Sequence, residues 1–256
     1  MKHIYSTKTL ITASLSLILS TAVFSQVAQS TEPQPALVQG SMTGDAPSDA
    51  IVLFSGNDLL AWERTADDGP ARWMIENQVM TVQKGVGTIK TKQLFGDIQL
   101  HLEWQPTATI EGSGQSRGNS GVFLHSLFEL QILDSWENPT YINGQAGSIY
   151  LQHAPLVNAS KPPGEWQSFD ITFSAPLYNS GKLETPAYVT VYQNGILIQN
   201  HVEISGATYT TEPEYKMQCE PYSQNGRMQD CSGKMPITLQ DHGQTVSYRN
   251  IWVREL

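Results

Sequence analysis

The feature that most constrains this chain is a succession of short runs in which apolar and polar residues alternate. In the clearest run, residues 95–104, the two kinds of side chain separate onto two faces, with Ile98, Leu100, Leu102 and Trp104 against Gln99, His101 and Glu103. A period of two over this length is typical of a half-buried β-strand, because a helix would need a period of 3.6. From Ile51 onward almost no segment has the helical period, which favours an all-β domain.

Turn residues separate these runs at the spacing of β-hairpins. Tyr188–Gln193 is joined to Ile196–Ile198 by Asn194 and Gly195, and both residues of such a turn need positive φ, which Asn and Gly tolerate best. The same signals predict two more antiparallel pairs and one further strand: Trp73–Ile75 with Val79–Val82, Ile237–Gln240 with Val246–Val253, and Trp166–Phe173. Many short strands of this kind predict a β-sandwich or a barrel.

The N-terminal stretch has the parts of a secretory signal peptide: basic Lys2, His3 and Lys8, an apolar run over residues 10–24, and small residues after it. We therefore predict a signal peptide over residues 1–28, a flexible linker over 29–49 and a single domain over 50–256. An uncleaved membrane anchor is the alternative, although the apolar run is shorter than the about 20 residues that a span needs. The predicted location is outside the cytoplasm, in the periplasm or the medium, with no membrane contact after cleavage.

The 2 cysteines, Cys219 and Cys231, lie close together in a long irregular stretch, residues 206–234. In an oxidising compartment we expect them to form a disulfide that ties this stretch down as an insertion at one rim of the domain. A pair of metal ligands is the alternative, and it is weaker because no histidine lies nearby. Loops of this length are often functional, and a plain surface insertion is the other possibility.

Charge and motif content exclude several classes of function. The chain has 15 Lys and Arg against 24 Asp and Glu, a formal net charge of -9, so no nucleic-acid partner is expected. It contains no P-loop, dinucleotide fingerprint, HExxH motif or EF-hand loop. We predict no cofactor; a divalent metal could bind Asp134 or Asp241, but the spacing does not require one.

The strongest candidates for catalytic residues lie in an acidic strand that we predict from Phe128 to Asp134. Alternation turns Glu129 and Gln131 away from the core, whereas it would bury Asp134, which is costly without a partner. A β-bulge at residues 132–133 would return Asp134 to the face of Glu129. Two carboxylates on one face suit acid–base chemistry on a glycosidic or hydroxylated substrate. The alternative is an ordinary polar face whose acids bond to backbone groups or to arginine.

Other candidates are weaker. Gln240 and His242 precede a turn, and Arg249 follows on the next predicted strand, where its guanidinium could clamp a hydroxyl-rich ligand. His242 and His125 carry imidazoles that can exchange a proton near neutral pH. Trp136, just after the acidic strand, is the best candidate for stacking on a sugar ring, against simple packing in a loop.

A series of segments then occurs in order from about Ile51 to Leu256: Leu53–Leu59 with Trp62, Trp73, Gly87–Lys92, Phe95–Asp97, Asn119–Gly121, Glu129–Ser135, Gly147–Tyr150, Lys161–Trp166, Asn194–Gly195, Leu239–Gly243 and Arg249–Ile251. With NSG, ELQILDS and LQDHG in this order, the chain resembles the 3-keto-disaccharide hydrolase family of exported bacterial proteins. The resemblance implies a concanavalin A-like jelly-roll β-sandwich of two antiparallel sheets. It also implies action on glycosides that carry a ketone at C3 of the sugar. Gln167, where the family pattern has Asn, and the 206–234 stretch depart from the family.

The implied chemistry needs a base for the hydrogen on C2, an acid for the leaving oxygen and a donor at the ketone oxygen. By residue type, Glu129 or His242 is the predicted base and Asp134 its partner or the acid. Arg249 or His125 is the predicted donor.

The predicted partner is a carbohydrate substrate, with Asn119, Gln131 and Gln240 holding sugar hydroxyls and Trp136 stacking on a ring. Two other functions stay open. One is a lectin-like module that binds sugar without cleaving it, since one fold serves many functions. The other is a conventional glucanase that uses the two carboxylates directly on unoxidised sugar.

Overall fold

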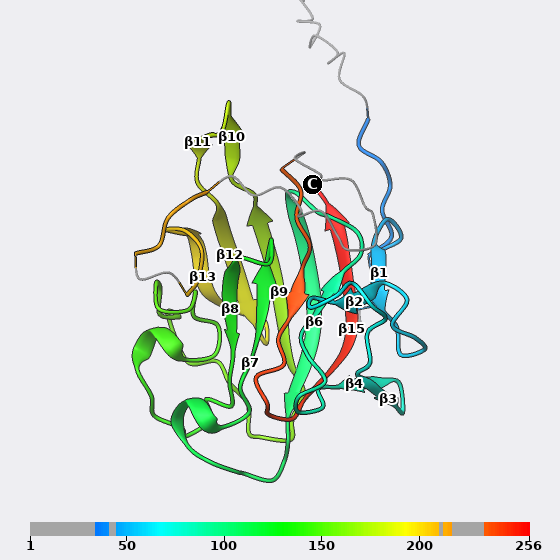
Figure 1. The fold of residues 1–256 in the computed structure, drawn as a ribbon, viewed down its shortest axis with the longest axis vertical. Coiled ribbons are helices and arrows are strands. Elements are labelled where there is room, and N and C mark those ends of the chain that lie inside the picture. The colour runs from blue at the N-terminus through cyan, green and yellow to red at the C-terminus, as the bar shows by residue number, and fades with distance from the viewer. Residues whose placement is uncertain (1–33, 41–44, 210–211, 217–232) are drawn as a thin grey trace, which may run out of the picture. The chain divides into compact units, whose positions relative to one another are not determined.

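The computed structural model describes residues 34–40, 45–209, 212–216 and 233–256 (Figure 1). By compactness the chain divides into residues 1–37 and residues 38–256, and every element below belongs to the second unit. The predicted signal peptide and the predicted disulfide between Cys219 and Cys231 lie outside the described residues. Among the described residues, no helix is both long and apolar enough to cross a membrane.

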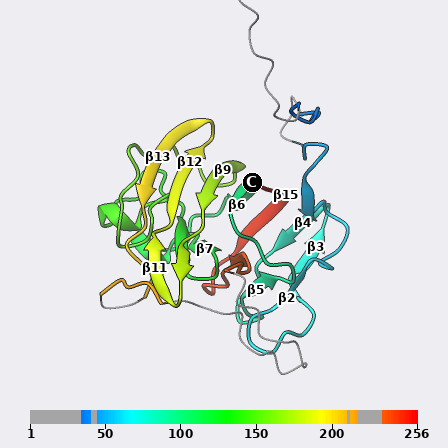
Figure 2. The same ribbon diagram turned by 90° about the horizontal axis from the view of Figure 1, so that it is seen from above.

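The larger of two main sheets runs in the order β13-β12-β9-β6-β15-β4-β3, with β1 also paired to β15. In Figure 2 it curves from β13 on one side to β3 on the other. Its strands are β1 (Ile51–Phe54), β3 (Met74–Glu76), β4 (Val79–Thr81), β6 (Ile98–Pro106), β9 (Gln167–Ser174), β12 (Tyr188–Gln193), β13 (Ile196–Glu203) and β15 (Val246–Glu255).

The smaller sheet runs in the order β2-β5-β14-β7-β8. Its strands are β2 (Trp62–Arg64), β5 (Ile89–Thr91), β7 (Ser120–Leu124), β8 (Phe128–Ile132) and β14 (Thr238–Leu239). Outside both sheets lie the hairpin of β10 (Leu177–Asn179) and β11 (Lys182–Thr185) and two 3-10 turns, η1 (Gly114–Ser116) and η2 (Ile142–Gly144). The strand pairs are antiparallel, which confirms the predicted jelly-roll sandwich of two antiparallel sheets.

One apolar core fills the space between the two sheets. Phe128 of β8 and Phe173 of β9 meet across it, with ring centroids 6.1 Å apart. One buried hydrogen bond also joins the sheets, since the Tyr248 hydroxyl of β15 lies 2.6 Å from Oγ of Ser120 in β7. Because every second residue of each strand enters this core, the residues between them project from the outer faces of the sandwich.

Two predicted hairpins are confirmed in their turns as well as in their strands. β12 and β13 are joined by Asn194 and Gly195 at φ 53° and 78°, and β3 and β4 by Asn77 and Gln78 at φ 51° and 64°. Positive φ at both central residues is the geometry whose twist matches two antiparallel strands.

The third predicted pair is wrong. β14 pairs with β5 and β7 in the smaller sheet, whereas β15 pairs with β6, β4 and β1 in the larger one. The turn at His242 therefore carries the chain from one sheet to the other. Both strands are apolar and alternating, so their local pattern suits either sheet, and packing selects the partner.

The predicted bulge at residues 132–133 is also wrong. β8 pairs with β7 in unbroken register from Phe128 to Ile132 and then ends. Leu133 is buried in the core next to Ile132, so the alternation stops at the end of the strand.

Candidate active site

Glu129 lies on the outer face of the smaller sheet. β8 sends Phe128, Leu130 and Ile132 into the core, which leaves Glu129 and Gln131 on the opposite face. The register of the sheet then aligns Glu129 with one residue from each of the other strands: Phe123 of β7, Thr238 of β14, Lys90 of β5 and Glu63 of β2. Lys90 is held by Asp68 at 3.2 Å and Glu63 at 3.9 Å.

Three residues of this row, Lys90, Phe123 and Thr238, line a depression, which we call the active-site groove. Three strand steps separate Lys90 from Glu129, a distance of about 14 Å between backbones. The cavity in this groove has a volume of about 360 Å³ and is also lined by Gln240. Glu129 lies one strand step beyond Phe123, beside the cavity and outside its lining. That volume falls within the range of small-molecule sites, which combine apolar walls with a few fixed polar groups.

The Glu129 carboxyl is buried, with 1% of the residue exposed. Burial raises its pKa to about 7, and a hydrogen bond from the Tyr209 hydroxyl opposes that rise. Its Oε2 has no hydrogen-bond partner among the described residues. Room for the carboxyl depends on Gly121, since a Cβ there would lie 2.5 Å from Oε1. A carboxyl with a pKa near neutrality can both take and return a proton at physiological pH.

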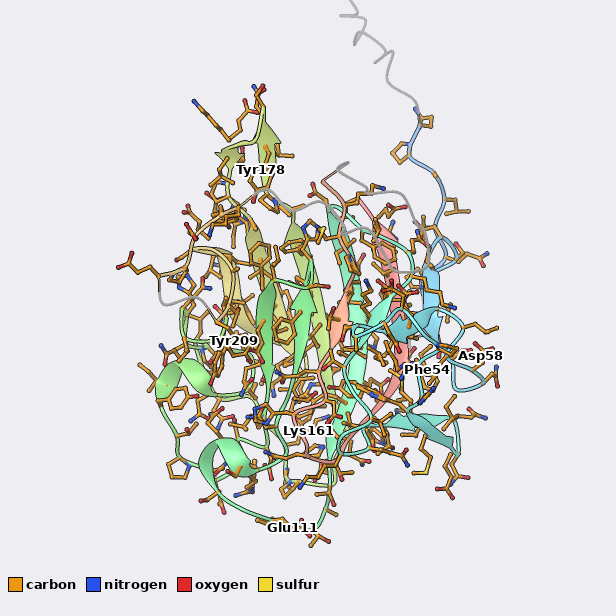
Figure 3. The ribbon with its side chains drawn as sticks, in the orientation of Figure 1. Phe54, Asp58, Glu111, Lys161, Tyr178 and Tyr209 are labelled. Carbon is orange, nitrogen blue, oxygen red and sulfur yellow. The ribbon has the colours of Figure 1, made fainter. Side chains whose placement is uncertain are left out.

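Tyrosine side chains cover Glu129. Tyr209, labelled in Figure 3, follows β13 and stacks on Phe123 with centroids 6.1 Å apart. Gln240 donates to the Tyr209 hydroxyl at 3.2 Å, and the Tyr209 ring contacts the ring of Tyr150. Burial raises the pKa of the Tyr209 phenol, so it stays a neutral donor. The sequence patterns did not point to Tyr209, because it lies in the irregular 206–234 stretch.

Amide side chains gather beside the carboxyl. Gln131 lies with its amide nitrogen 3.0 Å from Oε1 of Gln115, and Asn119 donates to the backbone oxygen of Gln115 at 2.8 Å. If its amide is turned over, Gln131 instead donates to Oε1 of Glu129 at 3.3 Å. Gln244 accepts from the Asn119 backbone at 2.9 Å. The structure thus brings together Glu129, Gln131 and Asn119, with Gln240 two strand steps from Glu129, as hydrogen-bonding groups on one face.

Comparisons with known proteins agree with this architecture. The family described as 3-keto-alpha-glucoside-1,2-lyase-like domain matches residues 49–254. The chain belongs to this family. The resemblance seen in the sequence is therefore confirmed at the level of the family.

Three solved structures from Parabacteroides distasonis ATCC 8503, each described as a candidate glycosyl hydrolase, are similar to this family member. One is 46% identical, covers 90% of this chain and 95% of its own, and superposes with a TM-score of 0.80. The second is 20% identical with a TM-score of 0.54 and coverages of 81% and 94%; the third is 21% identical with a TM-score of 0.52 and coverages of 81% and 99%. The latter two show the shared fold alone. No protein with curated annotation matches the chain.

The structure of this family member places Asp134 in a buried ion pair. Nε of Arg117 lies 2.6 Å from its Oδ2, the Trp136 backbone donates to its Oδ1 at 3.2 Å, and Asn138 bonds to its backbone oxygen at 2.6 Å. Both carboxylate oxygens thus hold the chain that leaves β8. Trp136 lies in this same loop and is 39% exposed.

The two histidines predicted from the sequence as site residues lie outside the lining of the active-site groove. His125 sits in the turn between β7 and β8, packed edge-on against Phe173, and burial lowers its pKa to about 4. It is therefore a neutral core residue at physiological pH. His242 is exposed in the turn after β14, next to Asp241, which caps the backbone of Gly87 and Gly243.

Arg249 projects from the outer face of the larger sheet, where it pairs with Glu103 at 2.6 Å. It is separated from Glu129 by the whole sandwich. In the described residues, no three His, Cys, Asp or Glu side chains come together as a metal site.

Proposed function

We propose that this protein cleaves 3-keto-glycosides, with Glu129 as the base that removes the hydrogen on C2 of the oxidised sugar. The observation that carries the proposal is the buried carboxyl of Glu129, whose pKa of about 7 suits proton transfer at neutral pH. Its position beside a sugar-sized groove and under a hydroxyl-bearing aromatic ring supports a carbohydrate as the substrate. Membership of the family supports the ketone at C3.

The proposed reaction is an elimination. Glu129 takes the proton from C2, and the electron pair of the broken C–H bond delocalises onto the oxygen of the C3 ketone. The resulting enolate expels the substituent oxygen from C1, a C1=C2 double bond forms, and the departing oxygen takes the proton that Glu129 now holds. Addition of water at C1, with one proton of that water passing through Glu129 to C2, would complete a net hydrolysis. Without that addition, the enzyme would be a lyase.

Neighbouring donors suit the charge that develops. We assign Tyr209 and Gln240 to the enolate oxygen, because both are neutral donors on the face of Glu129. Asn119, Gln131 and Gln115 would bind sugar hydroxyls. Since Tyr209 also covers Glu129, its ring would shift when the substrate arrives.

A conventional glycosidase needs two carboxylates about 5 to 9.5 Å apart, both free to act on the substrate. Both carboxylate oxygens of Asp134 are already bonded, one to Arg117 and one to the Trp136 backbone. The second free carboxylate is therefore missing from this position, which disfavours that mechanism.

The test compares a disaccharide with its 3-keto derivative, using the purified domain and its Glu129→Gln variant. We expect turnover of the 3-keto form alone, loss of at least a hundredfold in kcat for the variant, and slower turnover of substrate deuterated at C2, because that C–H bond breaks. Cleavage of the unoxidised sugar would instead establish a glucanase. Binding of either sugar without turnover would establish a lectin-like module.

We also propose that the protein is exported, from the signal-peptide pattern of residues 1–28. Mass spectrometry of the protein from the periplasm should find a mature N-terminus near residue 29. An intact Met1 on cytoplasmic protein would contradict it.

A further inference from the structure

A strained bulge in β15 organises a second polar cluster, on the outer face of the larger sheet. The pairing of β15 with β6 shifts register between Arg249 and Trp252, and Asn250 takes a φ of 47°. Positive φ is unusual for a residue other than glycine inside a strand, and such strain gathers at functional sites. The bulge aims two consecutive side chains at Glu103: Arg249 donates to Oε2 at 2.6 Å and Asn250 to Oε1 at 2.9 Å.

His101 extends the cluster. Its Nε2 accepts from Asn250 at 3.3 Å, so its Nδ1 carries the proton and donates to Oδ1 of Asp170 at 2.7 Å. Its ring stacks on Trp252 with centroids 5.2 Å apart. Side chains from three strands are thereby fixed in place before any ligand arrives.

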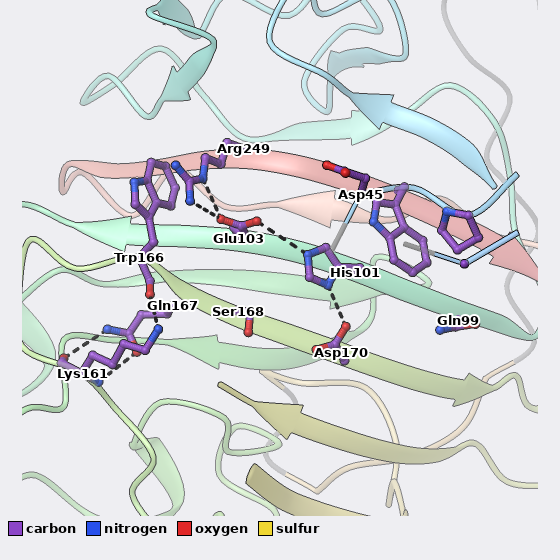
Figure 4. Close-up of a pocket in the computed structure, with 13 residues that line it drawn as sticks. Asp45, Gln99, His101, Glu103, Lys161, Trp166, Gln167, Ser168, Asp170 and Arg249 are labelled. Atoms are coloured by element: carbon purple, nitrogen blue, oxygen red, sulfur yellow. Dashed lines mark hydrogen bonds and ion pairs between the residues drawn. The ribbon is translucent and has the colours of Figure 1, made fainter. Parts of the chain in front are cut away.

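A cavity of about 550 Å³ lies over this cluster, and we call it the outer-face cavity. Figure 4 shows Glu103, His101 and Asp170 along its floor and Trp166 at one end, with the guanidinium of Arg249 4.1 Å from the centre of the indole ring. The Asp170 and Arg249 side chains are 45% and 42% exposed, so both present polar atoms to the cavity. Rigid polar groups beside an indole are the usual elements of a small-ligand site.

The charges favour a neutral ligand. Three carboxylates line the outer-face cavity, from Asp45, Glu103 and Asp170, against two cations, from Arg249 and Lys161. The Glu103 and Arg249 charges offset each other, and an anion would meet Asp170 and Asp45. Hydroxyl groups can both donate to carboxylates and accept from the guanidinium, which suits this mixture.

We propose that the outer-face cavity is a second carbohydrate site, which holds one or two neutral sugar units without cleaving them. It lies on the opposite face of the sandwich from Glu129, so a glycan held there leaves the active-site groove open. The inference does not depend on the reaction proposed for Glu129.

The test fills the cavity without removing any of its contacts. Ser168 lines it from β9, and Ser168→Trp would occupy the space of a sugar ring. Thr172 lies on the same face of β9 but is exposed outside the cavity, so Thr172→Trp is the matched control. The probes are maltose, cellobiose and cellotriose, titrated into each protein while the indole N–H signal of Trp166 is followed by NMR.

We expect a saturable shift of the Trp166 signal with at least one of these sugars, kept in Thr172→Trp and weakened at least tenfold in Ser168→Trp. The kcat/KM of Ser168→Trp on a 3-keto disaccharide should stay within twofold of the unsubstituted protein. No shift with any of the three sugars, or an equal shift in both variants, would overturn the second site. A parallel fall of binding and kcat/KM would also overturn it, because the cavity would then be part of the catalytic site.

Discussion

At the scale of single residues, the distinguishing feature is a carboxyl buried without a cation. Asp134 and Glu63 are also buried, but Arg117 and Lys90 lie beside them. The Glu129 carboxyl has the neutral Tyr209 phenol as its hydrogen-bond donor, and Lys90 lies three strand steps away, so desolvation is only partly offset and the pKa of Glu129 rises. The pairing of a buried acid with a cation therefore separates the structural carboxylates from the candidate catalytic one.

This burial predicts a pH-dependent stability. The pKa of Glu129 is raised from 4.5 to about 7, so the folded state binds more protons than the unfolded state between these values, and its stability falls as the pH rises through them. The loss is about 3 kcal/mol, at 1.36 kcal/mol per pKa unit. Glu129→Gln removes this titrating group and with it the pH-dependent loss of stability. Relative to the unsubstituted protein, the free energy of unfolding of the variant should therefore rise by about 3 kcal/mol between pH 4 and pH 8.

Urea unfolding at several pH values measures this gain. Glu165→Gln, at an exposed position, is the control. Its free energy of unfolding should differ from that of the unsubstituted protein by the same amount at every pH. A constant difference for Glu129→Gln as well would mean that the carboxyl is not desolvated.

At the scale of elements, β7 and β8 act as a unit. The glycine at position 121 of β7 makes room for the Glu129 carboxyl of β8, since the nearest neighbours of an added Cβ would be the tip of that flexible acid and the Phe123 ring. A strand glycine normally weakens a sheet, so its use here serves the carboxyl.

Gly121→Ala should therefore change activity more than stability. We expect the free energy of unfolding to change by at most about 1 kcal/mol. We expect kcat/KM to fall at least tenfold, since small displacements of a reacting group cost about 10² in rate. Gly96→Ala is the control, because its added Cβ meets only Lys234 at 3.8 Å. Unchanged activity in Gly121→Ala would show that Glu129, at its present position, does not act as the base.

The loop after β8 is held by the ion pair of Arg117 and Asp134. Removing one partner strands a buried charge, so Arg117→Met should cost about 3 kcal/mol of stability. Adding Asp134→Leu should recover at least half of that loss, because the double variant has no buried charge left. A double-mutant cycle by urea unfolding measures the coupling. Additive losses would show that the pair contributes nothing as a pair.

At the scale of the molecule, the two outer faces of the sandwich carry different functional groups. One carries Glu129 and the active-site groove, and the other carries the outer-face cavity with Arg249. A chain of hydrogen bonds runs through the core between them, from Tyr248 through Ser120 to the Gln240 backbone. Because Ser120 donates to that carbonyl, the tyrosine hydroxyl donates to Ser120.

Tyr248→Phe should cost about 1 kcal/mol, the net worth of one buried hydrogen bond. Both sheets should still unfold together, so circular dichroism and tryptophan fluorescence should give the same urea midpoint. Tyr188→Phe, which loses a hydroxyl bond to Glu203 at an exposed position, is the control and should change little. Two separate midpoints for Tyr248→Phe would show that this bond couples the sheets.

The sequence by itself determined what depends on neighbours along the chain. The period of two predicted β6, β8 and β9, and the Asn194-Gly195 turn predicted its hairpin, because strand faces and tight turns are set by a few adjacent residues. The same alternation placed Glu129 and Gln131 on an outer face. Motif order determined the family.

Only the tertiary structure decided which distant residues meet. The pairing of β14 with β5 and β7, and not with β15, moved Arg249 to the other face from Glu129. The pairing of Asp134 with Arg117, and the placing of Tyr209 over Glu129, likewise join residues whose separation no local pattern encodes. The physical reason is that alternation specifies which face a side chain takes, whereas contacts between strands are selected by the packing of the whole core.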